Sequence, residues 1–256
     1  MTGRTATTNR DPNSSQTAVF EVRYTKAADK TGWLWIKLEN DPEPTVKKTV
    51  SEYTKVTIQK KEGGRTYFLI QEGRYANQVG SLSDANVSKC LIPFKRGNGA
   101  VLNVKKIGRK IEKSPFFPRP YNQLFSTLSF NGKTARITID SDVDFEERNP
   151  ASPNNGKILH SKPLPDGKYK ILAPTYSGNP DFTIGYRAAY PNLKADTVWF
   201  HIEYAPTYNS NFVHVGNLSE GCITCYEISK WNDLYDYLIT NRLDSKGKYI
   251  GTLIIG

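Results

Sequence analysis

Apolar and polar residues alternate along most of this chain, a pattern typical of β-strands that bury one face. The segment 61–65 reads KEGGR and indicates a hairpin turn between two such strands. The first half contains nothing with the spacing of a long amphipathic helix, so we expect a small all-β domain, barrel-like or trefoil-like. Its predicted strands cover residues 18–25, 32–40, 54–61, 66–72, 89–95 and 100–106.

The alternation continues in the second half and gives way to a helical period near the end. Apolar residues recur every three or four positions over 227–243, which predicts an amphipathic helix there. We therefore expect a mainly β chain with one late α-helix. The strands predicted in this half cover 125–132, 133–140, 167–174, 181–187, 197–205, 211–216 and 249–256.

Charge and proline content predict a domain boundary near the middle of the chain. Residues 1–120 hold 22 Lys and Arg against 11 Asp and Glu, whereas residues 121–256 hold 13 against 14. Three prolines lie within 113–120, and proline fixes φ and removes an amide donor, which suits a linker. The expected parts are a flexible tail (1–16), a basic all-β domain (17–112), a Pro-rich linker (113–120) and a second domain (121–256).

Two interpretations of the basic domain stay open. A basic surface attracts anionic polymers such as nucleic acid, anionic lipid headgroups or acidic wall polymers. Its aromatic residues, Trp33, Trp35, Tyr67, Phe68 and Tyr75, would then stack on bases or sugar faces. Alternatively, the cations form a solvated face and the aromatic rings pack in the core. The sequence carries no recognised nucleic-acid-binding signature.

Composition predicts a chain that is made in the cytoplasm without a membrane span. No apolar run approaches the roughly 18–20 residues that cross a bilayer. The first sixteen residues are polar and lack the apolar region of a Sec signal peptide. The chain has three cysteines, an odd and low number, which favours synthesis in the reducing cytosol over a disulfide-stabilised scaffold.

Reactive side chains gather just before the predicted helix, and nucleophilic catalysis is the first interpretation of them. His214 ends a predicted strand, and Cys222 follows eight residues later after a turn that contains glycine. An imidazole beside a thiol lowers its pKa and supplies the thiolate that attacks a carbonyl. Gly221 lets the backbone approach a substrate, and the amides of Gly221 and Cys222 can face a developing oxyanion.

Three other interpretations compete with catalysis. His201, His214, Cys222 and Cys225 form a His2Cys2 set for a zinc-stabilised domain, although their spacing matches no known zinc motif. Cys222 and Cys225 also form a C-x-x-C pair, the spacing of thiol redox motifs. Finally, buried inert cysteines and hydrogen-bonded histidines would give the same pattern.

Two segments carry a resemblance to a known family. Residues 214–217 read HVGN and residues 219–224 read SEGCIT, which resembles the signature of the L,D-transpeptidase catalytic domain, the YkuD-like family. Upstream, residues 149–172 resemble that family's Gly-Lys pair followed by a Pro-x-Gly-x-Tyr-x-Ile strand. The resemblance covers about residues 120–256, and the upstream matches are Gly156, Lys157, Pro165, Gly167, Tyr169 and Ile171.

The resemblance implies a β-rich domain in which Cys222 attacks the third-residue carbonyl of a peptidoglycan stem peptide. An amine or water then resolves the acyl-enzyme, as in an L,D-transpeptidase or L,D-carboxypeptidase, without a cofactor or metal. His214 would act as base, Ser219 would support it, and Gly221 with Cys222 would offer oxyanion amides. The residues expected to contact the substrate are His201, Glu220, Thr224, Asn217 and Arg187.

Departures from the family pattern resemble a divergent branch of secreted antibacterial effectors. Many members carry His at the position of Glu220 and Arg at the position of Thr224. The implied partners are stem peptides, a secretion machinery and an immunity protein, and the implied place of action is the periplasm or cell wall, including that of another cell. The alternative is a non-catalytic protein that binds cell wall or an anionic polymer on a degenerate catalytic fold.

Overall fold

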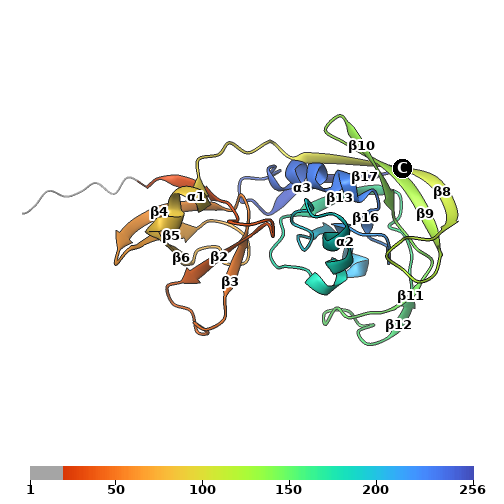
Figure 1. Ribbon diagram of the computed structural model, residues 1–256, viewed down its shortest axis with the longest axis horizontal. Helices are drawn as coiled ribbons and strands as arrows, with labels where there is room; N and C mark the ends of the chain where they lie inside the picture. The colour runs from red at the N-terminus through yellow and green to blue at the C-terminus, as the bar shows by residue number, and fades with distance from the viewer. Residues whose placement is uncertain (1–19) are drawn as a thin grey trace, which may run out of the picture.

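The computed structural model describes residues 20–256, which form two β-structures that lie side by side (Figure 1). The expected mainly β fold is confirmed, with one late helix in the second half. The flexible tail predicted at 1–16 lies outside the described residues. Within 20–256, no helix has the length and apolar character needed to cross a bilayer.

The first structure is a seven-stranded sheet with the order β3-β2-β6-β5-β4-β1-β7. The alternation seen in the sequence becomes alternate burial, as in β5, and the buried side chains form one small core with the short helix α1. The turn predicted at 61–65 is confirmed, since Glu62 pairs with Arg65 across two glycines with positive φ. The elements are β1 (Val22–Thr25), β2 (Trp33–Leu38), β3 (Lys48–Ser51), β4 (Lys55–Glu62), β5 (Arg65–Ile70), β6 (Val79–Ser83), α1 (Asp84–Cys90) and β7 (Leu91–Ile92).

The second structure is a closed barrel with the order β10-β16-β15-β14-β13-β17-β8-β9. Most neighbours are antiparallel, but β15 runs parallel to β16 and β17 runs parallel to β8. A separate hairpin joins β11 (Asp144–Glu146) to β12 (Ile158–His160). The barrel strands are β8 (Ala100–Glu112), β9 (Tyr121–Phe130), β10 (Lys133–Thr138), β13 (Gly167–Leu172), β14 (Phe200–Glu203), β15 (Phe212–Val215), β16 (Ile223–Cys225) and β17 (Tyr249–Ile255).

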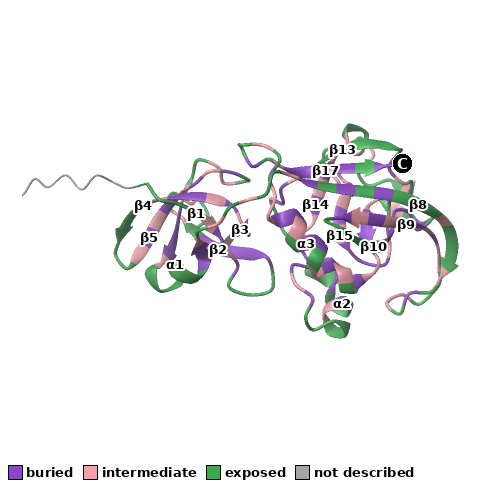
Figure 2. Ribbon diagram, turned by 90° about the horizontal axis from the view of Figure 1, so that it is seen from above, coloured by how far each residue is buried: buried purple, intermediate pink, exposed green. Residues whose placement is uncertain are grey.

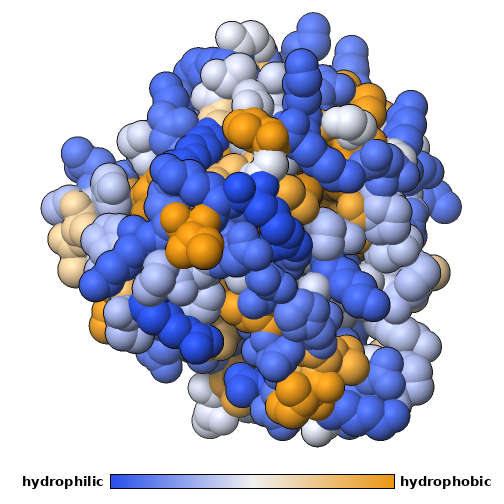
Figure 3. Space-filling view, turned by 90° about the vertical axis from the view of Figure 1, so that its right-hand side faces the viewer, coloured by the Kyte–Doolittle hydropathy of each residue, from blue (hydrophilic) through white to orange (hydrophobic). Residues whose placement is uncertain are grey.

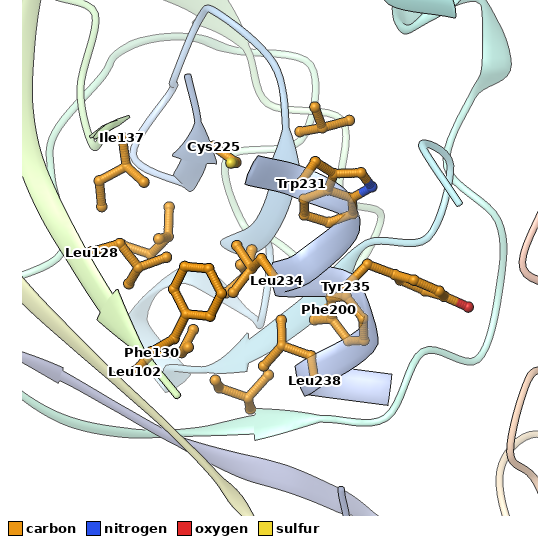
Figure 4. Close-up of a cluster of buried hydrophobic side chains, with 14 of the residues drawn as sticks. Leu102, Leu128, Phe130, Ile137, Phe200, Cys225, Trp231, Leu234, Tyr235 and Leu238 are labelled. Atoms are coloured by element: carbon orange, nitrogen blue, oxygen red, sulfur yellow. The ribbon is translucent and has the colours of Figure 1, made fainter. Parts of the chain in front are cut away.

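The late helix packs its apolar stripe against the barrel core (Figure 4). The helical period predicted over 227–243 is confirmed in its central part, as η3 (Ile228–Lys230) and α3 (Trp231–Ile239). The stripe residues Trp231, Leu234 and Leu238 are fully buried. Because burial of such side chains supplies most of the free energy of folding, α3 holds the barrel together on this side.

The domain boundary predicted at 113–120 is wrong. Strand β8 pairs with β17 and β9, and Figure 2 shows its buried and exposed positions alternating within the barrel. The basic cluster near 105–113 therefore lies on the barrel, and the prolines connect β8 to β9. The chain passes from one β-structure to the other at 93–99 instead. Figure 3 views the barrel end of the molecule, where hydrophilic side chains separate hydrophobic patches.

The strand predicted at 181–187 is also wrong. The segment forms η1 (Pro180–Phe182) and α2 (Ile184–Ala189). The side chain of Asn179 accepts a hydrogen bond from the amide of Asp181 at 3.0 Å, which caps the first turn. The guanidinium of Arg187 then bonds to the carboxylate of Asp196 and holds the helical turns in place.

Buried polar contacts join the sheet to the barrel. The hydroxyl of Tyr235 on α3 donates to the carboxylate of Glu52 at 2.7 Å. Glu72 of the sheet binds Arg96 and lies 3.6 Å from Arg242 of the barrel. These groups are largely buried, and their contacts across the interface add to the hydrogen bonds that Glu52 and Glu72 accept from backbone amides within the sheet.

Candidate active site

The parallel pairing of β15 with β16 sets the positions of the candidate catalytic pair. His214 lies directly opposite Thr224 in this ladder. Cys222 precedes Thr224 by two residues, and residues two apart in an extended chain face the same side. The neighbours Val213 and Ile223 point into the barrel core, so His214 and Cys222 share the outward face of the barrel wall.

Two hydrogen bonds determine the protonation of His214. Its Nδ1 lies 2.9 Å from the carbonyl oxygen of Val215, which can only accept, so Nδ1 carries the proton. Nε2 is then unprotonated and accepts from the hydroxyl of Thr224 at 3.2 Å. Burial lowers the pKa of His214 to about 4, which keeps the imidazole neutral at pH 7.

The thiol of Cys222 is partly buried and protonated. Burial raises its pKa to about 12, and the nearby carboxylate of Glu220 adds to this effect. The lowered thiol pKa expected from the neighbouring imidazole is therefore wrong. Among residues 20–256, the imidazole of His214 bonds to Val215 and Thr224, and no hydrogen bond joins it to the sulfur of Cys222.

The turn that leads to Cys222 is shaped by the hydroxyl of Ser219. This oxygen donates to the carbonyl of Cys222 at 2.7 Å and accepts from the amide of Gly221 at 3.2 Å. Ser219 therefore supports the turn rather than His214. The amide of Gly221 is already engaged by the serine, so of the two expected oxyanion donors only the amide of Cys222 remains a candidate.

Gly221 occupies a position that only glycine fits. Its φ of +107° is disfavoured for other residues, and a Cβ here would lie 2.5 Å from the carbonyl oxygen of Lys162. The side-chain amide of Asn211 donates to the carbonyl of Gly221 at 2.8 Å. The segment that contains Lys162 thus closes over the turn from one side while Asn211 holds it from the other.

A buried polar network lies behind this turn. The hydroxyl of Ser141 accepts from the amide of Ser219 and donates to the side-chain carbonyl of Gln123, both at 2.7 Å. The amide of Gln123 donates to the carbonyl of Asn217 at 2.9 Å. Gln123 and Ser141 come from distant parts of the sequence and carry no motif, so nothing in the sequence pattern identified them.

Three residues expected to contact substrate are used inside the protein. Asn217 is buried, and its backbone amide donates to the hydroxyl of Tyr186 at 3.0 Å. Thr224 is fully buried against His214. The guanidinium of Arg187 donates to the carboxylate of Asp196. All three residues therefore make their contacts within the protein.

Glu220 and His201 lie near the candidate pair, and they differ in burial, because His201 is half-buried. Glu220 is exposed. His201 on β14 faces outward next to Phe212, with ring centroids 4.5 Å apart, and its Nδ1 bonds to the carbonyl of Asn209 at 3.0 Å. Burial lowers the pKa of His201, so this ring is also neutral at pH 7.

The zinc and redox interpretations do not fit this geometry. Cys225 is fully buried in the barrel core (Figure 4). It therefore lies on the opposite side of the wall from Cys222, which shares the outward face with His214. The two histidines and two cysteines therefore do not meet at one point, as a zinc site requires. The sulfurs of Cys222 and Cys225 also face opposite sides of the wall, so they cannot form the disulfide of a redox pair. In the part of the chain that the structure describes, no three His, Cys, Asp or Glu side chains are arranged to hold a metal ion.

No family model, curated protein or solved structure matches this chain.

Proposed function

We propose that this protein is a cysteine-dependent enzyme acting on the stem peptides of bacterial peptidoglycan, as an L,D-transpeptidase or L,D-carboxypeptidase. One observation carries the proposal. Adjoining parallel strands bring His214, with its unprotonated Nε2 directed toward β16, onto the same outward face as Cys222. The sequence motif at 214–224 supports the choice of stem peptides, and use as a secreted antibacterial effector belongs to the same proposal.

The pKa values of the pair favour attack by a neutral thiol with simultaneous proton transfer. The sulfur of Cys222 attacks the peptide carbonyl while its proton passes to Nε2 of His214, which must first leave the hydroxyl of Thr224. The imidazolium then protonates the departing amine, the C–N bond breaks, and a thioester remains. An incoming amine or water attacks the thioester and gives a proton to His214, which passes it to the departing sulfur of Cys222.

The test is digestion of purified muropeptides, followed by mass spectrometry of the products. We expect the wild-type protein to shorten or cross-link stem peptides and Cys222→Ala to lose at least about 10³-fold of this activity. Cys90→Ala is the matched control, because Cys90 is buried in the core of the sheet. Equal turnover by wild type and Cys222→Ala would end the proposal.

The protonated, partly buried thiol favours a second candidate, a non-catalytic protein that binds cell wall. This candidate predicts that wild type and Cys222→Ala sediment equally with purified sacculi. It also predicts that neither alters muropeptides. Turnover by the wild type selects the enzyme over this alternative.

A further inference from the structure

The segment 176–190 exposes large apolar side chains beside the candidate site. Tyr176 is 48% exposed and Phe182 is 58% exposed, with Ile184 and Tyr190 also open to solvent. Clustered exposed apolar side chains in a folded protein commonly mark a binding surface. The question is what this surface receives.

The exposed side chains stand on a rigid base. Tyr186 of α2 is buried, and its hydroxyl accepts from the amide of Asn217 at 3.0 Å, directly behind the turn of Cys222. Its ring packs edge-on against Phe116 at 4.6 Å. Arg187 anchors the other face of the helix to Asp196. The segment is thus fixed to the elements that carry the candidate catalytic pair.

Aromatic rings connect this surface to His214 without interruption. Trp199 lies 4.8 Å from the imidazole of His214, and Phe182 stacks on Trp199 at 6.1 Å with an interplanar angle of 18°. Tyr176 packs edge-on against His201 at 5.0 Å on the same side. We name Tyr176, Phe182 and Trp199 the aromatic shelf.

The chemistry of the shelf fits a neutral ring. Aromatic faces bind the apolar C–H face of a sugar by stacking, while the sugar hydroxyls stay in water. The segment 176–190 carries two charged residues, Asp181 and Arg187, and Arg187 is paired with Asp196, so this segment offers no unpaired cation to an anionic polymer. A sugar ring without charged groups on its stacking face matches this surface.

The position of the shelf also fits the proposed substrate. The two centroid separations, 4.8 and 6.1 Å, place the ring of Phe182 within about 11 Å of the imidazole. Three extended residues span roughly 10–11 Å. A stem peptide that holds its third residue at the imidazole and runs along Trp199 therefore has the length to bring its sugar as far as Phe182.

We propose that the aromatic shelf binds the sugar ring to which the stem peptide is attached, so that the substrate is a glycan-linked peptide rather than a free one. This inference rests on the proposed function, because the reach is counted from the imidazole of His214, the proposed base beside the attacked residue. Phe182 is then a specificity residue of the same site.

The test measures binding separately from turnover. Calorimetric titrations of Cys222→Ala compare a free stem tetrapeptide with the same tetrapeptide linked to its disaccharide. We expect the glycan-linked peptide to bind about five-fold or more tightly. Adding Phe182→Ala should remove this advantage and leave the affinity for the free peptide unchanged. Ile184→Ala is the matched control, because Ile184 is equally exposed but makes no ring contact with Trp199.

The outcomes separate the two proposals. Equal affinity for the free and the glycan-linked tetrapeptide overturns the proposal that the shelf binds sugar. An equal loss of affinity for both probes in Phe182→Ala overturns it as well. Either result would also be expected if the shelf binds another macromolecule. Turnover of muropeptides by wild type decides the proposed function independently. A glycan-dependent affinity without turnover retains the shelf and removes the enzyme.

Discussion

Single hydrogen bonds decide the chemistry available to His214. The carbonyl of Val215 fixes the proton on Nδ1, and the hydroxyl of Thr224 occupies the lone pair of Nε2. The ring therefore keeps one unprotonated nitrogen, but this nitrogen is directed at a threonine until a substrate changes the arrangement. The motif in the sequence identified His214 and Cys222, but spacing along a chain gives no measure of burial, so the sign of the thiol pKa shift was predicted wrongly.

The lowered pKa of His214 predicts a loss of stability in mild acid. The unfolded imidazole binds a proton below about pH 6.5, whereas the folded one does so only near pH 4. The unfolded state thus gains protons first, and stability falls as pH drops from 6.5 toward 4. Urea unfolding should show that the free energy of unfolding falls more between pH 7 and pH 4.5 for wild type than for His214→Gln. Equal losses in the two proteins would show that this histidine is not shielded.

The raised pKa of Cys222 predicts a slow thiol at neutral pH. Only the thiolate reacts with iodoacetamide, so the alkylation rate should rise about tenfold per pH unit from pH 7 to 10. Mass spectrometry of the modified peptide measures this rate, with Cys222→Ala as the background. A rate that is already constant at neutral pH would indicate an ion pair with His214 and contradict the neutral pair.

At the level of elements, the turn before Cys222 is held rigidly from both sides. Lys162 covers Gly221, while Ser141 and Gln123 support the turn from within the barrel wall. The strands that carry this turn were predictable from alternation, since one buried face leaves a clear period. The helical segment 180–189 was not, because Asn179 and Arg187 fix it through side-chain bonds that a strand-like sequence does not reveal.

Gly221→Ala tests the fit of this turn. A Cβ there meets the carbonyl of Lys162 at 2.5 Å, so the backbone must move and carry Cys222 with it. We expect activity to fall at least tenfold and stability to fall by about 2–4 kcal/mol. Gly132→Ala is the control, because Gly132 also has positive φ but nothing within 4 Å of the added atom. Equal effects of the two substitutions on activity would show that the turn tolerates a side chain.

At the scale of the whole molecule, the sheet and the barrel share a buried polar interface. Glu72 of the sheet faces Arg96 and Arg242, and Glu52 accepts from Tyr235. The domain boundary predicted at 113–120 was misplaced because of a contact between distant parts of the chain. Strand β8 pairs in parallel with β17, about 150 residues later, and no local pattern announces so distant a partner.

Glu72→Ala tests whether the two β-structures unfold together. The substitution leaves two buried guanidinium groups without their carboxylate, which we expect to cost about 3–5 kcal/mol. Glu62→Ala is the control, since Glu62 forms an exposed pair worth at most about 1 kcal/mol. Urea unfolding followed by tryptophan fluorescence and by circular dichroism should give one coincident transition for wild type. Two separate transitions would show that the interface does not couple the parts.

The central claim is that Cys222 forms an acyl intermediate with His214 as its base. Its most direct measurement is the intact mass of the protein after brief incubation with a stem tetrapeptide, followed by peptide mapping. The account predicts a mass increase equal to the acyl fragment, located on Cys222 and absent in His214→Gln. An unchanged mass, or an adduct on any other residue, would contradict it.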